Sequence, residues 1–153
     1  MRIALSADHA GFPLKQELLA ALTAAGHDVS DFGAYSTTPV DYPDAAESVA
    51  TALLDGSAER GIIVCGSGAG VSIAANKFPG VRAAVCHDTY TAHQAVEHDD
   101  LNVLCLGARV VGGALAQDIV RSFLSATFSG EARHQRRLDK VLAIEARFLA
   151  PRP

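Results

Sequence analysis

Short apolar runs alternate with longer amphipathic segments along the whole chain. Runs rich in Ile, Val, Leu and Ala and bounded by Gly, Asp or Pro are typical of strands buried on both faces of a sheet. Five runs are therefore predicted as strands: Arg2–Ser6, His27–Phe32, Gly61–Cys65, Arg82–Cys86 and Val103–Leu106. The segments between and after them are predicted as helices: Phe12–Ala25, Tyr42–Leu54, Gly68–Asn76, Thr89–Glu97, Gly112–Thr127 and His134–Phe148.

This alternation predicts an α/β fold in which helices cover both faces of a parallel sheet and the crossovers are right-handed. The 153 residues suit one domain that spans residues 1–153. In open sheets of this kind, ligands bind beyond the carboxyl ends of the strands. The last predicted helix, residues 134–148, carries more apolar side chains than one sheet edge needs, so we expect it to contact another subunit.

Composition narrows the classes of partner. The net charge is -4, and the 13 Lys and Arg residues are scattered until a cluster at residues 133–140, so no long basic face can follow a nucleic-acid backbone. The N-terminus turns polar after a few apolar residues, and no later run approaches the length of a membrane span. The sequence therefore predicts a cytoplasmic protein, with neither nucleic acid nor a membrane as partner.

The end of the first predicted strand combines an acid with an imidazole. Asp8 and His9 follow the strand directly, at the edge where ligands bind. Asp8 could equally serve to cap the helix that begins near Phe12. Both interpretations of Asp8 remain open from position alone.

A glycine-rich turn follows the third predicted strand and leads straight into a helix, with the sequence Cys65-Gly66-Ser67-Gly68-Ala69-Gly70. Glycines allow the backbone N–H groups to face a ligand, and the helix start adds partial positive charge, so the turn is predicted to bind an anion. The spacing differs from a dinucleotide fingerprint, and the Gly-Lys-Ser/Thr ending of a P-loop is absent.

Three cysteines at wide spacing fit neither a disulfide framework nor a clustered zinc site, so free thiols are expected. Cys65 stands beside a helix N-terminus, which gives a thiol thiolate character, although a cysteine in a strand is often only a small core residue. Cys105 lies in the middle of a strand and fits the core interpretation. Cys86, at the end of a strand, fits either.

Histidines and arginines cluster in the second half of the chain. His93 and His98 are five residues apart, and the helical step of about 100° separates them on the helix surface, so a metal site is not expected. Arg133 and Arg137 share one face if the last helix has already begun at residue 133, and two guanidinium groups suit a phosphate. A solvated basic turn is the simpler explanation for such a cluster.

Taken together, these motifs resemble the ribose-5-phosphate isomerase type B family, whose relatives include galactose-6-phosphate isomerase subunits and allose-6-phosphate isomerases. The resemblance covers nearly the whole chain. It rests on an ordered set of segments: Ser6-Ala7-Asp8-His9-Ala10-Gly11, Asp41-Tyr42-Pro43, the stretch from Cys65 to Lys77, His98-Asp99-Asp100-Leu101-Asn102-Val103-Leu104, Gly107-Ala108-Arg109-Val110-Val111-Gly112 and Arg133-His134-Gln135.

The resemblance implies a Rossmann-like three-layer α/β/α sandwich with a five-stranded parallel sheet. It also implies a homodimer or tetramer whose active sites lie between two subunits, some site residues crossing the boundary. The expected reaction is the interconversion of ribose 5-phosphate and ribulose 5-phosphate through a cis-enediolate, with a phosphorylated sugar as the partner molecule and with neither metal nor organic cofactor.

The resemblance further assigns expected roles to individual residues. Cys65 would be the general base, and His98 would open the sugar ring. Ser67 and the backbone N–H groups of the turn would hold the anionic intermediate, which involves Gly66, Gly68, Ala69 and Gly70. The expected sugar-binding residues are Asp8, Tyr42, Asp99 and Asn102, and the expected phosphate-binding residues are His9, Arg109, Arg133 and Arg137.

Two positions depart from the pattern frequent in the family: Asp99 stands where Asn is common, and Ser67 where Thr is common. A carboxylate at position 99 would place negative charge near the enediolate, so either its side chain points elsewhere or the preferred sugar differs. One alternative function is the same chemistry on a tetrose, another pentose, or allose or galactose 6-phosphate. The other is a catalytically silent sugar-phosphate or nucleotide-binding module.

Overall fold

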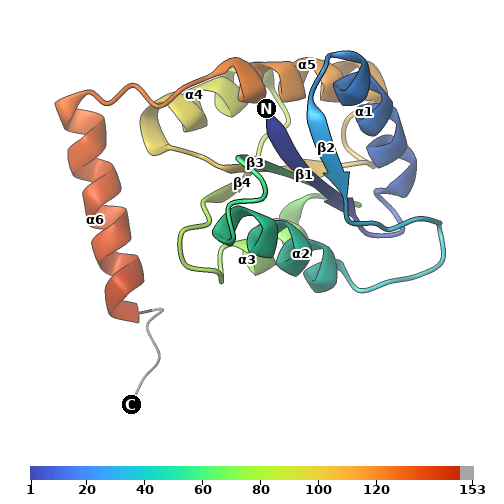
Figure 1. The fold of residues 1–153 in the computed structure, drawn as a ribbon, viewed down its shortest axis with the longest axis horizontal. Helices are drawn as coiled ribbons and strands as arrows, with labels where there is room; N and C mark the ends of the chain where they lie inside the picture. The colour runs from blue at the N-terminus through green and yellow to red at the C-terminus, as the bar shows by residue number, and fades with distance from the viewer. Residues whose placement is uncertain (149–153) are drawn as a thin grey trace.

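The computed structural model describes residues 1–148 and contains a five-stranded parallel sheet, as predicted (Figure 1). The strands, in spatial order, are β2 (Asp28–Asp31), β1 (Arg2–Ala7), β3 (Arg60–Cys65), β5 (Val103–Gly107) and β4 (Ala83–Val85). All four neighbouring pairs are parallel. The strand order reverses direction between β1 and β3, and open α/β sheets bind ligands at the carboxyl side of such a switch point.

Helices cover both faces of the sheet, which confirms the Rossmann-like three-layer arrangement. One face carries α1 (Phe12–Ala24), α4 (Thr89–Asp99) and α5 (Gly113–Ser125), and the other carries α2 (Tyr42–Leu54) and α3 (Ala69–Ala75) (Figure 1). The central strands β3 and β5 are buried on both sides, which explains why their sequences are continuous apolar runs. Among residues 1–148, no helix is both long enough and apolar enough to span a bilayer.

The last helix, α6 (Ala132–Phe148), projects from the sandwich and begins beside the end of α4 (Figure 1). Of its side chains, only His134 and Leu138 are buried. Val141, Ile144 and Phe148 remain 50–58% exposed along a groove that faces Val81 and Leu101. This helix therefore presents the excess apolar surface that its sequence predicted, while the short tail after residue 148 lies outside the described residues.

A buried ion pair joins α1 to the end of β2. Lys15 is fully buried, and its Nζ pairs with Asp31 Oδ1 and lies 5.0 Å from the centre of the Tyr35 ring. Asp31 Oδ1 also accepts a hydrogen bond from the Gly33 N–H at 2.9 Å. Since Gly33 O accepts the Ala7 N–H at 2.6 Å, the pair supports the loop beside the carboxyl end of β1.

We expect Asp31→Ala to destabilise the protein more than Lys15→Met. The alanine variant leaves the buried ammonium without a counter-ion, a change that typically costs about 3–5 kcal/mol of unfolding free energy. The methionine variant removes the buried charge, and the remaining carboxylate, 20% exposed, still reaches water and the Gly33 amide. Urea unfolding of both variants at one protein concentration measures the difference, and equal losses would contradict it.

Candidate active site

The carboxyl ends of β1, β3 and β5 meet at one edge of the sheet. In the register, Ala7 lies beside Val64 and Cys65 lies beside Gly107. The loop after β1 packs closely on this edge, because a Cβ at Gly11 would come within 2.2 Å of the Val64 carbonyl oxygen. Only glycine fits at position 11, so the Asp8–Gly11 loop is held directly against the strand that ends in Cys65.

Cys65 ends β3 with its sulfur turned into the glycine-rich turn. The side chain is buried, and Sγ accepts a hydrogen bond from the Gly68 N–H at 3.0 Å. Gly68 reaches this position with φ of +83°, a left-handed conformation that glycine adopts without strain. The α3 helix that follows the turn has only seven residues.

The other two thiols have a different environment. Burial, and to a smaller extent the nearby Asp88 carboxylate, raises the pKa of Cys86 to about 11. Burial also raises the pKa of the fully buried Cys105, beyond that of Cys86. Both thiols are therefore protonated at neutral pH. This outcome agrees with the core interpretation of Cys105 and favours the same interpretation for Cys86.

Asp8 organises the loop that faces Cys65. Its Oδ1 accepts hydrogen bonds from the N–H groups of Ala10 and Gly11, each at 2.9 Å. Helix α1 begins after Gly11 without a side-chain cap, so Asp8 stabilises the loop before the helix rather than the helix end itself. The carboxylate is 8% exposed at the edge predicted for substrate binding.

His9, Tyr42 and Arg109 surround the same edge. His9 Nδ1 lies 3.3 Å from the carbonyl oxygen of Val40, just before α2. A Cβ at Gly70 would lie 3.0 Å from the Tyr42 ring, and one at Gly66 would lie 3.6 Å from Arg109 Nη1, so these side chains cover two glycines of the turn. A cation, an imidazole, a phenol and a thiol thus gather around the glycine-rich turn.

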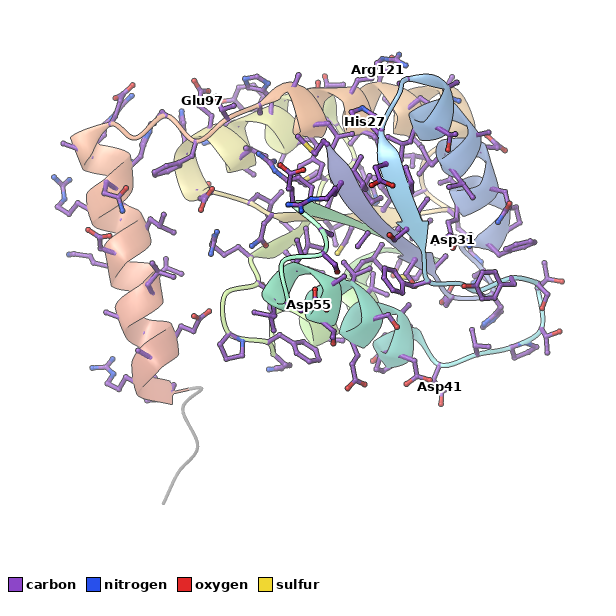
Figure 2. All side chains as sticks on the ribbon, in the orientation of Figure 1. His27, Asp31, Asp41, Asp55, Glu97 and Arg121 are labelled. Atoms are coloured by element: carbon purple, nitrogen blue, oxygen red, sulfur yellow. The ribbon has the colours of Figure 1, made fainter. Side chains whose placement is uncertain are left out.

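His98 lies at the opposite edge of the sheet. Helix α4 follows β4 and runs back across the sheet, so it ends close to the start of β5. In the register, the first residue of β5, Val103, lies beside Gly61 of β3. From Gly61 to Cys65 the strand extends by roughly 13 Å at 3.3 Å per residue. In Figure 2, Glu97, which directly precedes His98, lies well away from Asp31, which ends the edge strand β2.

The contacts of His98 define its protonation pattern. Its Nδ1 lies 2.8 Å from Gln94 Nε2, and because an amide NH₂ group only donates, Nδ1 accepts and the neutral ring carries its proton on Nε2. Its ring stacks on that of His134, with centroids 4.0 Å apart and planes inclined by 28°. Nε2 lies 3.7 Å from the Glu97 carboxylate.

Arg133 and Arg137 extend this second cluster. The α6 helix begins at Ala132, so both arginines lie on its first turns, as the four-residue spacing anticipated. Both are exposed, and Arg133 Nε donates to Glu131 Oε2 at 2.8 Å. Together with His98, they form a group of cations and an imidazole far from Cys65 of the same chain.

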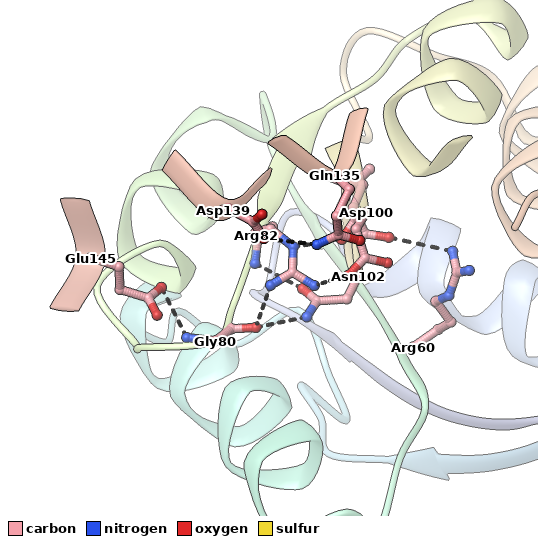
Figure 3. Close-up of polar contacts among 9 residues, drawn as sticks. Arg60, Gly80, Arg82, Asp100, Asn102, Gln135, Asp139 and Glu145 are labelled. Atoms are coloured by element: carbon pink, nitrogen blue, oxygen red, sulfur yellow. Dashed lines mark hydrogen bonds and ion pairs between the residues drawn. The ribbon is translucent and has the colours of Figure 1, made fainter. Parts of the chain in front are cut away.

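Asp99 and Asn102, the remaining two residues expected to bind the sugar, have different surroundings in the structure. Asp99 is exposed and lines the groove between α6 and Arg82, whereas His98 lines a different hollow beside Tyr90, so the two side chains face different spaces. Asn102 is already engaged: its Oδ1 accepts the Arg82 N–H and its Nδ2 donates to Gly80 O, both at 2.8 Å (Figure 3). These bonds explain Asn102 without a ligand.

Several residues of both clusters escaped the sequence analysis. His87 Nε2 accepts the Gly107 N–H at 2.9 Å, directly beside Cys65 in the register, and Gln94 and His134 contact the His98 ring. The position of His87 immediately after a strand was the signal that could have identified it. Within the described part of the chain, no three or more His, Cys, Asp or Glu side chains are grouped so as to hold a metal ion.

Comparison with known proteins gives close matches over nearly the whole chain. The family described as Ribose/Galactose Isomerase matches residues 3–141. Ribose-5-phosphate isomerase B of Escherichia coli (strain K12) is 47% identical over 146 residues, which cover 95% of this chain and 97% of that protein. D-erythrulose-4-phosphate isomerase of Pectobacterium atrosepticum is 44% identical over 133 residues, 85% of this chain and 86% of that protein.

A solved structure agrees with these matches. Ribose-5-phosphate isomerase B from Mycoplasma genitalium with bound ribulose-5-phosphate superposes with a TM-score of 0.88 and 41% identity, covering 94% of this chain and 95% of that chain. The two chains therefore share their fold over nearly their whole length. The chain therefore belongs to the ribose/galactose isomerase family of sugar phosphate isomerases.

Proposed function

We propose that the protein interconverts ribose 5-phosphate and ribulose 5-phosphate by moving a proton between C1 and C2. The observation that carries the proposal is the Cys65 sulfur, which accepts the Gly68 N–H beside an anion-binding turn covered by Arg109. Proton transfer next to a carbonyl needs a base and a group of donors that stabilises the oxyanion, and a guanidinium beside them suits the phosphate of the substrate.

In this mechanism, Cys65 takes the proton from C2 of the open-chain aldose. The electron pair moves to the carbonyl group and gives a cis-enediolate, whose negative charge is held by Ser67 and the N–H groups of Gly66 to Gly70. Cys65 then returns the proton to C1 while O2 gives up its hydroxyl proton and O1 gains one, which yields the ketose. Asp8 and Tyr42 contact the sugar, His9 and Arg109 contact the phosphate, and no residue assigned here requires a metal or an organic cofactor.

The second cluster completes the site from a neighbouring subunit. His98, Arg133 and Arg137 lie on the edge of the sheet opposite Cys65, so they serve the same substrate only if they come from another copy of the chain. The exposed apolar side of α6 and the exposed Tyr90, Val110 and Leu115 offer surface for such a contact. We therefore propose a homodimer, or a tetramer built from dimers, in which each active site combines Cys65 of one subunit with His98 of another.

The relatives favour a pentose phosphate. The Escherichia coli relative is named for ribose 5-phosphate, and the Mycoplasma genitalium structure holds ribulose 5-phosphate. The Pectobacterium relative is named for a four-carbon sugar, which keeps a tetrose phosphate as the second candidate. In this proposal, residues 1–153 form one domain. The protein acts in the cytoplasm, where phosphorylated sugars are made and consumed.

A panel of aldose phosphates tests the proposal. We expect ribose 5-phosphate to give a higher kcat/KM than erythrose 4-phosphate, allose 6-phosphate or galactose 6-phosphate, and EDTA to leave the rate unchanged. A higher kcat/KM for another sugar would show that this sugar, and not ribose 5-phosphate, is the preferred substrate. A loss of rate with EDTA would reject the metal-free mechanism. Turnover of none of these sugars would favour a silent binding module.

A further inference from the structure

The cluster around His98 contains a buried histidine that the mechanism above does not use. His134 lies in the first turn of α6 and is 1% exposed. Its ring covers one face of the His98 ring at a centroid distance of 4.0 Å. A buried imidazole stacked on the group proposed to open the sugar ring is placed to control where that group points.

His134 is itself held by the chain that precedes it. Its Nδ1 lies 2.6 Å from Ser129 Oγ, and the Ser129 N–H donates to the Glu97 carbonyl oxygen at 2.9 Å. The connection therefore runs from the last turn of α4 through the loop before α6 and back to the His98 ring. Gln94 holds the edge of the same ring through Nδ1.

The same residue also fixes the phosphate-binding arginines. His134 and Leu138 are the two buried side chains that α6 contributes within the described residues, so they are its main anchors on the sandwich. Arg133 immediately precedes His134, and Arg137 lies one helical turn further on. A shift of His134 would therefore move both arginines together with the face that supports His98.

The electrostatic surroundings suit a supporting rather than a proton-carrying role. Burial lowers the pKa of His134, and the neighbouring His98 and Arg133 lower it further, against an opposing effect of Glu131. A neutral His134 avoids the repulsion that two stacked imidazolium rings would suffer.

We propose that His134 is a positioning residue that holds the His98 imidazole and the arginines Arg133 and Arg137 as one unit, so that ring opening and phosphate binding occur at a fixed separation. This inference rests on the proposed function, in which His98 opens the ring of the substrate. It adds that the stack on His134, and not only the bond to Gln94, sets the geometry of that step.

Two sugars separate ring opening from proton transfer. Ribose 5-phosphate exists mainly as a closed ring and must be opened before C2 can lose its proton. Ribulose 5-phosphate is open, because the C5 oxygen that would close its ring carries the phosphate. Exchange of its C1 proton with solvent deuterium, followed by NMR at saturating sugar, therefore reports the proton transfer alone, while turnover of ribose 5-phosphate reports both steps.

We expect His134→Asn to lower kcat for ribose 5-phosphate by about 10²-fold, the effect of misplacing a reacting group by about 1 Å. The exchange rate of saturating ribulose 5-phosphate should stay at the wild-type value. His134→Phe keeps a flat ring on His98 and should recover most of the lost turnover. If the asparagine variant fails to fold, the phenylalanine variant tests the inference by itself, because it should keep most of the wild-type turnover.

Leu138→Ala is the matched control, because it loosens α6 without touching His98. It should raise KM for both sugars through the arginines, without separating turnover from exchange. Equal losses of turnover and exchange in His134→Asn, or no loss in either, would overturn the inference. The wild-type protein tests the proposed function separately: if it isomerises neither sugar, the function itself is wrong, whatever the variants do.

Discussion

Replacement of Cys65 by alanine is expected to lower kcat by about 10²- to 10⁴-fold, the range that a positioned general base contributes. The loss should appear in both directions of the reaction and should also abolish deuterium exchange into ribulose 5-phosphate, because every one of these processes requires a proton to leave carbon. The fold should survive, since alanine fills most of the small buried site.

The expectation depends on the difference between the three thiols. The Cys65 sulfur accepts a hydrogen bond from the Gly68 N–H. Burial instead raises the pKa of Cys86 to about 11, so that this thiol stays protonated in the core. Cys105→Ala is the matched control: it removes a sulfur from the same buried layer but should keep normal turnover at a modest cost in stability. Near-normal turnover in Cys65→Ala would reject the assigned base.

Mixed dimers of two inactive variants are expected to regain activity. Cys65→Ala and His98→Asn should each reduce turnover of ribose 5-phosphate by about 10²–10⁴-fold. In a two-fold symmetric dimer with shared sites, the mixed species contains one site with both native residues and one with neither, so it should reach about half of the wild-type rate. Two affinity tags allow the mixed dimer to be purified and assayed directly.

The physical basis of this prediction is the separation of the two clusters within a chain. Cys65 stands at the carboxyl edge of the sheet and His98 at the amino edge, so one chain cannot bring them to one sugar. Mixed dimers in which both substitutions lie on the same subunit serve as the control, because each of their sites lacks one native residue. Activity no higher than that of this control would show that the sites are not shared.

The boundaries of the strands and helices were predictable from local patterns. Every predicted end falls within two residues of the observed one. The reason is that β3 and β5 are covered on both faces, so nearly every residue must be apolar and the run in the sequence has the length of the strand. The same reasoning places Cys65 at a strand end and Cys105 inside a strand.

Side-chain partners from distant segments were not predictable in this way. Lys15 lies in a helix beside exposed polar residues, and nothing near it in the sequence indicates that Asp31 and Tyr35 enclose its ammonium group. In the sequence, His134 appears only as part of a basic motif. Its burial is not predictable from that motif, because it depends on α4 and on the loop before α6. Asn102 is expected at the sugar from its motif, whereas in the structure its amide is bonded to the backbone of Gly80 and Arg82, just before β4.

The sequence by itself determined the order of the elements, a parallel sheet covered by helices on both faces, and the position of Cys65 before a glycine-rich turn. These properties follow from local patterns, because burial and turn geometry constrain neighbouring residues. Only the tertiary structure decided that His98 and the arginines of α6 lie at the far edge from Cys65. That outcome depends on the direction in which α4 crosses the sheet and on the contacts of α6, which are made between segments far apart in the chain.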